Sequence, residues 1–297
     1  MLASSPVHSI STTAIDIHFH QYGNPAGKPV FLLHGFPDSP AAWLPVIDRL
    51  DKGKLRLIVP YLRGAGPTSI HLPNHLSGEP AALASDLLTL ADHLSLDCFH
   101  IVGQDWGALA AYSTAVLAPE RVRGLLTIAS PYVSPAKPLP NPQVQAFWYQ
   151  WFFNTARGSK AFTVDPIPFC RHLWKAWSPK WDFAEKDFAE AARSFTNPQF
   201  TSVVLHFYRQ RYGADPRLPP YHLASEILDT HPRISVPTIY IQGADDACTL
   251  PASSLDQKPS FTGPYGRVLL KNTGHFPHRE DPKSTAKFLN RLLSKHP

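Results

Sequence analysis

The sequence lacks the features that would send a protein into a membrane or through a secretory pathway. Its N-terminus, MLASSPVHSIST, has neither the charged region nor the apolar region of a signal peptide. No apolar run approaches the roughly 20 residues needed to span a bilayer. Cysteine is scarce: Cys98, Cys170 and Cys248 are odd in number, widely spaced and outside any C-x-x-C pattern. We therefore expect a cytoplasmic protein whose cysteines are small buried hydrophobes, not disulfide partners or metal ligands.

Charge is also sparse, at 17% of the 297 residues, and the net charge of +5 comes from scattered Lys and Arg. The absence of a basic run argues against a nucleic-acid partner. What the sequence does have is a hydrophobic fraction of 43%, which is ample for the core of a globular enzyme.

Short apolar runs alternate with segments of helical periodicity. Residues 15–22, IDIHFHQY, alternate as an antiparallel edge strand would. Further strands are expected at residues 29–35, 55–60, 98–103, 122–130, 237–243 and 266–272, with helices at 40–50, 81–94 and 106–117. Strands separated by helices predict a mostly parallel sheet that is flanked by helices on both faces.

This rhythm is interrupted between about residues 131 and 220. The break opens with five prolines in twelve residues, PYVSPAKPLPNP, and holds five of the seven tryptophans. Helical periodicity replaces the strand pattern there. We therefore predict an α/β core of residues 1–131 and 221–297, with an inserted helical cap of residues 132–220 that covers the active-site edge of the sheet.

The segment VGQDWGA has the small-x-nucleophile-x-small pattern of a nucleophile elbow, with Asp105 at its centre. It follows a predicted strand and precedes a predicted helix, which is the context that this motif requires. The alternative is that Asp105 only caps the helix.

A histidine and a second acid complete a catalytic triad in the chain order of hydrolases of this kind. His275, in NTGHFPHREDP, follows the last predicted strand, and His278 is its competitor. The orienting acid lies in IQGADDACTL, where the G-x-x-D spacing favours Asp246 over Asp245. An acid after the strand at 122–130 is excluded, because no Asp or Glu occurs from residue 121 to residue 164.

Four motifs, HGFPDS, GQDWGA, GADD and GHFPHRE, resemble those of the α/β-hydrolase superfamily, and within it the epoxide hydrolases and dehalogenases with an aspartate nucleophile. The likeness covers nearly the whole chain. It departs at Tyr61, where the family commonly has aspartate, and at Gln104, where histidine is frequent. The resemblance implies the α/β-hydrolase fold with a cap.

A carboxylate nucleophile indicates the class of substrate. Aspartate is ionised at neutral pH and needs no base to attack, and attack on an sp³ carbon gives an alkyl ester. His275, oriented by Asp246, would then activate water to hydrolyse that ester. The backbone N–H groups of Phe36 and Trp106 would hold the oxyanion. We expect no metal or cofactor, and a small apolar epoxide or organohalide as substrate.

Epoxides and organohalides differ in their leaving group, which requires different partner residues in the site. Epoxide hydrolases of this type use two cap tyrosines as proton donors, and Tyr149 and Tyr208 occupy similar positions here, with Tyr212 as a competitor. Dehalogenases often carry Asn where Phe36 stands, whereas haloacid enzymes place arginines at the positions of Trp106 and Leu109. The sequence therefore favours an epoxide hydrolase. A dehalogenase, or a ligand-binding protein of this fold without catalysis, is the alternative, and the oligomeric state stays open.

Overall fold

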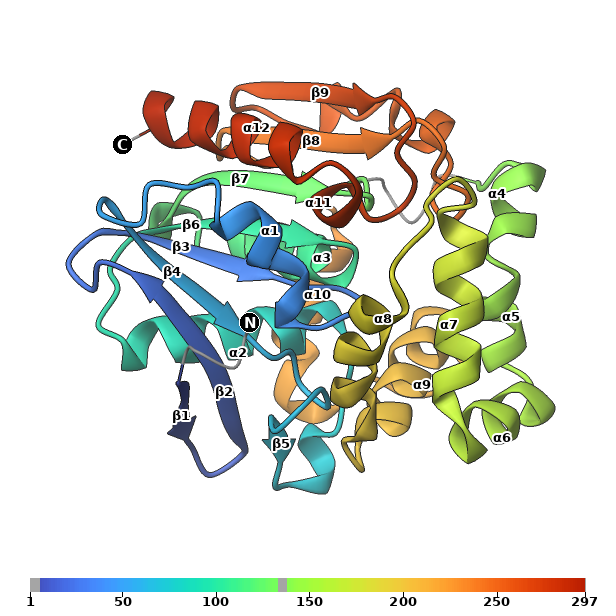
Figure 1. The fold of residues 1–297 in the computed structure, drawn as a ribbon. Coiled ribbons are helices and arrows are strands. Elements are labelled where there is room, and N and C mark those ends of the chain that lie inside the picture. Colours follow the sequence, from blue (N-terminus) through green and yellow to red (C-terminus); the bar gives the residue numbers. More distant parts are fainter. Residues whose placement is uncertain (1–5, 133–137, 297) are drawn as a thin grey trace.

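The computed structural model describes residues 6–132 and 138–296, and a nine-stranded sheet forms the centre of this part of the chain (Figure 1). Its strands are β1 (Val7–Ser11), β2 (Ile15–Gly23), β3 (Lys28–Leu33), β4 (Leu55–Pro60), β5 (Ser69–Ile70), β6 (Phe99–Gln104), β7 (Val122–Ile128), β8 (Thr238–Gly243) and β9 (Tyr265–Leu270). Their order is β1-β2-β4-β3-β6-β7-β8-β9, and β5 pairs with β2. Strands β3, β4 and β6 to β9 are parallel. The predicted mostly parallel sheet is confirmed.

One strand prediction is wrong in its position. β2 is antiparallel to its neighbours but lies inside the sheet, between β1 and β4. Alternating burial shows only that one face of a strand packs on the core, and this holds for internal and edge strands alike. The edge is the short strand β1, most of whose residues are exposed.

Helices cover both faces of the sheet. Those of the α/β part are α1 (Leu44–Ile47), α2 (Pro80–His93), α3 (Trp106–Leu117), α10 (His222–Asp229), α11 (Pro277–Glu280) and α12 (Pro282–Lys295). Helices α2, α3 and α10 pack together on one face, and α1, α11 and α12 on the other. Side chains of β3 alternate between the two cores: Phe31 and Leu33 join the first, and Val30 and Leu32 the second. The helix expected at 40–50 is shorter than predicted, because a 3₁₀ turn (Pro40–Trp43) precedes α1.

Between β7 and α10 the described chain is helical. Its helices are α4 (Asn141–Ala146), α5 (Trp148–Phe153), α6 (Ala156–Val164), α7 (Pro166–Trp177), α8 (Glu185–Ala192) and α9 (Phe200–Arg211). They stand beyond the carboxyl ends of the parallel strands, on the right of Figure 1. Residues 133–137 of the predicted cap lie outside the described residues, and the division into core and cap domains stays a prediction.

Aromatic packing joins these helices to the sheet. The ring of Phe36, in the loop after β3, lies at 5.8–6.4 Å from rings contributed by Phe153, Phe162, Trp177, Phe200 and Tyr208. Phe36 is only 2% exposed. The helices therefore cover the carboxyl ends of the parallel strands, where the predicted catalytic residues lie.

Candidate active site

Asp105 stands at a sharp turn between β6 and α3. Its φ of 51° and ψ of −114° lie in a region that side-chain-bearing residues rarely adopt. Glycine is required on both sides of Asp105, because any larger residue would clash with the backbone. A Cβ at Gly103 would lie 2.1 Å from the carbonyl oxygen of Gly107, and a Cβ at Gly107 would lie 2.3 Å from the carbonyl oxygen of Leu33. The Asp105 carboxylate makes no capping hydrogen bond to α3. The helix-cap alternative is therefore wrong, and the strained turn directs the carboxylate elsewhere.

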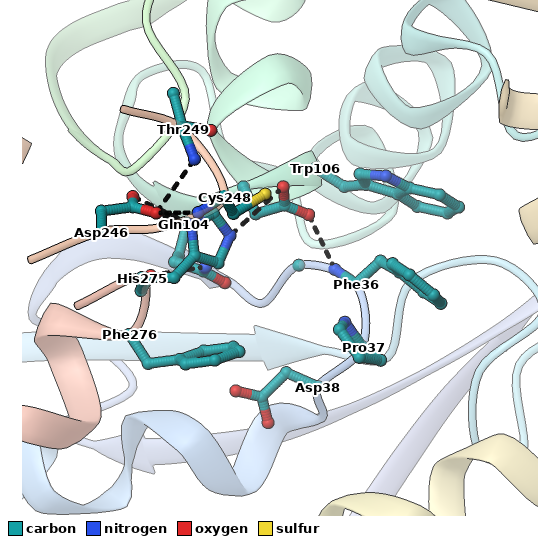
Figure 2. A network of polar contacts seen from close by, with 12 residues as sticks. Phe36, Pro37, Asp38, Gln104, Trp106, Asp246, Cys248, Thr249, His275 and Phe276 are labelled. Atoms are coloured by element: carbon teal, nitrogen blue, oxygen red, sulfur yellow. Dashed lines mark hydrogen bonds and ion pairs between the residues drawn. The ribbon is translucent and has the colours of Figure 1, made fainter. Parts of the chain in front are cut away.

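The Asp105 carboxylate faces two predicted partners. Its Oδ1 accepts a hydrogen bond of 2.9 Å from the backbone N–H of Phe36, drawn as a dashed line in Figure 2. Its Oδ2 lies 3.7 Å from Nε2 of His275. Trp106 begins α3, where the first N–H groups of a helix have no intrahelical acceptor. The carboxylate thus lies between one backbone donor, the N–H of Phe36, and an imidazole, and the role of the Trp106 N–H stays a prediction.

His275 is held from its other side by Asp246 (Figure 2). Nδ1 of His275 lies 3.1 and 3.0 Å from the two oxygens of Asp246. The same carboxylate accepts backbone N–H bonds from Cys248 and Thr249, and a side-chain bond from Gln242. With its oxygens fixed by these donors, Asp246 orients the imidazole toward Asp105.

The competing residues lie elsewhere. Asp245 pairs with Lys180 at 2.8 Å. His278 packs on Trp43 with ring centroids 4.7 Å apart, and its Nε2 lies 3.6 Å from Asp38. The structure therefore brings Asp246 and His275 together with Asp105, and not Asp245 or His278.

The charge on His275 follows from its two carboxylate neighbours. Burial alone would lower the pKa of His275, but the charges and hydrogen bonds of Asp246 and Asp105 outweigh burial and raise this pKa to about 10. At neutral pH the ring is therefore an imidazolium between two carboxylates. Asp246 makes the larger contribution to the raised pKa, and Asp105 adds to it.

The backbone of His275 is held by residues that the sequence analysis missed. Its N–H donates to Oγ of Ser178 at 2.8 Å, and Ser178 donates to Oε1 of Glu280 at 2.8 Å. Glu280 also accepts from the N–H of Gly274 at 2.7 Å. Gln104, noted only as a departure from the family, donates to the His275 carbonyl at 3.2 Å. Glu280 lies within the GHFPHRE motif, whereas nothing in the sequence indicates Ser178, which is 97 positions away from His275.

Tyr149 of α5 and Tyr208 of α9 are both brought to the site. Their rings meet edge to face, with centroids 5.3 Å apart. Burial raises the pKa of both phenols well above 10, and the nearby charge of Asp105 adds to this rise. Both hydroxyls are therefore protonated at any pH at which the protein would work.

Each phenol oxygen accepts a hydrogen bond from a neighbouring N–H. Nε1 of Trp106 donates to Tyr208 at 3.3 Å, and Nε2 of Gln150 donates to Tyr149 at 2.8 Å. The competitor Tyr212 instead donates to Oε1 of Gln150 at 2.5 Å. Sequence reasoning missed Gln150, which follows Tyr149 directly.

A cavity opens above Asp105, with both phenols and Trp106 in its wall. Tyr212 is not among the residues that line it. The rest of the wall combines apolar residues (Leu109, Pro131, Leu139, Phe147 and Phe207) with polar ones (Ser130, Gln143, Gln150, Arg211, Thr249 and Ser253). Within residues 6–132 and 138–296, no group of His, Cys, Asp or Glu is arranged to hold a metal ion. No helix of the same residues has the length and apolar character needed to cross a membrane.

Comparison with known proteins places this geometry in a family. Residues 28–282 match the model of the alpha/beta hydrolase fold family. An epoxide hydrolase of Caballeronia sordidicola is 24% identical, over 96% of this chain and 93% of that protein. Epoxide hydrolase A of Mycobacterium tuberculosis is 23% identical, over 96% of each chain. The crystal structure of a candidate epoxide hydrolase from Klebsiella pneumoniae superposes with a TM-score of 0.90 at 32% identity, over 96% of both chains. The chain belongs to the alpha/beta hydrolase fold family.

Proposed function

We propose that this protein is an epoxide hydrolase that opens an oxirane to a vicinal diol through an ester of Asp105. The observation that carries the proposal is the arrangement around one cavity. A carboxylate nucleophile lies at its floor, and two protonated phenols, Tyr149 and Tyr208, line its wall. The names of the relatives support the same assignment.

In the first step, Asp105 attacks an epoxide carbon, and the carbon–oxygen bond to that carbon breaks. The departing oxygen would leave as an alkoxide, and it takes a proton from one of the two phenols. The product is a hydroxyalkyl ester of Asp105. The strained elbow and the Phe36 N–H hold the carboxylate in position for this attack.

In the second step, His275 activates water. Ester formation removes the negative charge of Asp105, which is one of the causes of the raised pKa of His275. His275 then releases its proton, which can restore the phenol, and becomes a base. Water attacks the carbonyl carbon of the ester, and the N–H groups of Phe36 and Trp106 hold the oxyanion. His275 takes one proton of this water; the bond between the carbonyl carbon and the diol oxygen then breaks, and that oxygen takes the remaining proton of the added water. The diol leaves, and Asp105 regains its carboxylate.

The geometry of the site disfavours a dehalogenase reaction, in which a halide ion would be the leaving group. A departing halide needs N–H donors, but the indole N–H of Trp106 is already directed to the Tyr208 oxygen. Phe36 stands where a second donor, Asn, would serve a dehalogenase. The proposed leaving group is therefore an oxygen that needs a proton.

We also propose the domain division, the kind of substrate and the cellular setting that the sequence predicts. The helices of residues 132–220 form a cap over the core of residues 1–131 and 221–297, and the apolar residues of the cavity wall favour a small apolar substrate. Cys98, Cys170 and Cys248 are free thiols, which supports a cytoplasmic setting. The mechanism calls for no metal, cofactor or nucleic acid.

A substrate panel tests the proposal. Styrene oxide, a long-chain terminal epoxide and a haloalkane are each incubated with the protein, and diol and halide are measured. We expect diol from at least one epoxide, no halide, and at least about a 10³-fold loss in Asp105→Ala. Halide release without diol would favour the dehalogenase. Tight binding of a ligand with no turnover of any compound would favour the non-catalytic alternative.

A further inference from the structure

A chain of polar side chains leads from the surface of the cap to Tyr149. Arg211, at the end of α9, is exposed, and the next residue, Tyr212, is partly buried. The Tyr212 hydroxyl donates to Oε1 of Gln150 at 2.5 Å, and Nε2 of Gln150 donates to the Tyr149 oxygen at 2.8 Å. Gln150 and Tyr149 are only 3% and 1% exposed. Water therefore has little access to the inner half of this chain.

The amide group of Gln150 sets the direction of the hydrogen bonds in this chain, and Arg211 at the outer end is compatible with it. Arg211 carries only donors, because a guanidinium has no acceptor. Burial raises the pKa of Tyr212, and Arg211 opposes this through its charge and a side-chain hydrogen bond. Oε1 of Gln150 is an amide oxygen and can only accept, so the Tyr212 hydroxyl donates its proton to it. With Oε1 occupied, the amide group of Gln150 presents its NH₂ to Tyr149.

This direction turns the Tyr149 proton away from Gln150. Its oxygen accepts from Gln150, so its own O–H must point to another neighbour. Two neighbours are available: Sγ of Cys248 at 3.6 Å, and the hydroxyl of Tyr208, whose oxygen already accepts from Trp106. Tyr149 and Tyr208 both line the cavity above Asp105. Sulfur is a weak acceptor and holds the proton loosely. A substrate oxygen that enters the cavity is a better acceptor.

We infer that Gln150 is a positioning residue that turns the hydroxyl proton of Tyr149 toward the substrate oxygen. The inference rests on the proposed function. Gln150 does for Tyr149 what the indole of Trp106 does for Tyr208, since each fills the acceptor side of a phenol with an N–H. The two phenols thereby aim both protons at one developing alkoxide.

Two variants of nearly equal size test the direction of the chain. Gln150→Glu replaces the donor by a carboxylate that accepts from both Tyr212 and Tyr149, so the Tyr149 proton turns away from the substrate. Gln150→Met fills the space with neither donor nor strong acceptor, and Tyr149 can still donate. In single-turnover experiments, we expect Gln150→Glu to slow formation of the alkyl-enzyme by about 10²-fold. Gln150→Met should stay within about 10-fold of the wild type.

A merely structural role predicts the opposite order, because glutamate keeps the Tyr212 hydrogen bond and methionine loses both. The pH profile gives a second readout. A buried carboxyl group has a raised pKa, and once protonated it has a donor again. Ester formation by Gln150→Glu should therefore recover as the pH is lowered from about 8 to about 5. Gln150→Met should show no such recovery.

Gln143→Glu is the matched control for a new carboxylate in the cavity wall. Gln143 is buried, and its hydrogen bonds go to the backbone of Cys248 and Leu250 instead of Tyr149. We expect Gln143→Glu to show no recovery of ester formation at low pH. Hydrolysis of the preformed ester should be unchanged in both Gln150 variants, which reports an intact second step. If Gln150→Met is as slow as Gln150→Glu, or slower, the inference is wrong. If the wild type forms no ester with any epoxide, the proposed function fails instead.

Discussion

Among single residues, the proposed chemistry depends on the protons of the two phenols and of His275. The Asp105 carboxylate is ready to attack without a base, and the nearby phenols keep their protons because burial raises their pKa well above 10. His275 is the reverse case, since Asp246 and Asp105 together raise its pKa, and an ester of Asp105 would remove one of these two contributions. In the proposed mechanism, the phenols are therefore the acids of the first step and His275 is the base of the second.

Removing one phenol should therefore affect one step only. Tyr149→Phe and Tyr208→Phe should each slow epoxide opening by about 10- to 10²-fold, because the remaining phenol still donates a proton. Hydrolysis of a preformed alkyl-enzyme should be largely unchanged. Rapid-quench measurement of ester formation and decay separates the two rates. Tyr265→Phe, on β9, removes a phenol outside the cavity and should change neither rate. Full opening activity in both single variants would show that these tyrosines are not the proton donors.

At the scale of elements, the end of α7 supports the loop that carries His275. Ser178 follows α7, accepts from the His275 N–H and donates to Glu280. The packing is close, because a Cβ at Gly274 would lie 2.3 Å from Oγ of Ser178. One helix between β7 and β8 therefore fixes the backbone of the proposed base.

Ser178→Ala should leave the buried N–H of His275 without a partner, at a cost of about 1–3 kcal/mol, whereas Oε1 of Glu280 keeps its hydrogen bond from the N–H of Phe276. We expect the water-activation step to slow by about 10-fold while epoxide opening stays near the wild-type rate. The alkyl-enzyme should then accumulate in the steady state, where intact-protein mass spectrometry detects it. Ser253→Ala is the control, because Ser253 lines the cavity but its hydroxyl donates to Leu250 in its own turn. Equal slowing of both steps in Ser178→Ala would contradict a specific effect on His275.

At the scale of the whole molecule, periodicity and short motifs predict much of the architecture. The strands at β6 to β9 and helix α3 follow from apolar runs and helical spacing, and the elbow follows from the glycines around Asp105. The position of β2 could not be predicted, because alternation does not reveal which strands lie on either side. The parts of the site that were missed, Ser178 and Gln150, have ordinary local sequences. Their importance comes from side-chain contacts that only the folded chain creates, such as the bond between Ser178 and His275.

The covalent role of Asp105 can be tested directly by isotope labelling. In a single turnover in ¹⁸O-water, Asp105 should transfer one of its own oxygens to the diol, and water should replace that oxygen when the ester is hydrolysed at its carbonyl. We predict ¹⁸O in the peptide that contains Asp105 and none in the first diol. His275→Gln should stop only the second step, so that the ester accumulates as a mass adduct on the same peptide. Label in the diol and none in the protein would show that water attacks the epoxide directly, and would contradict the covalent mechanism.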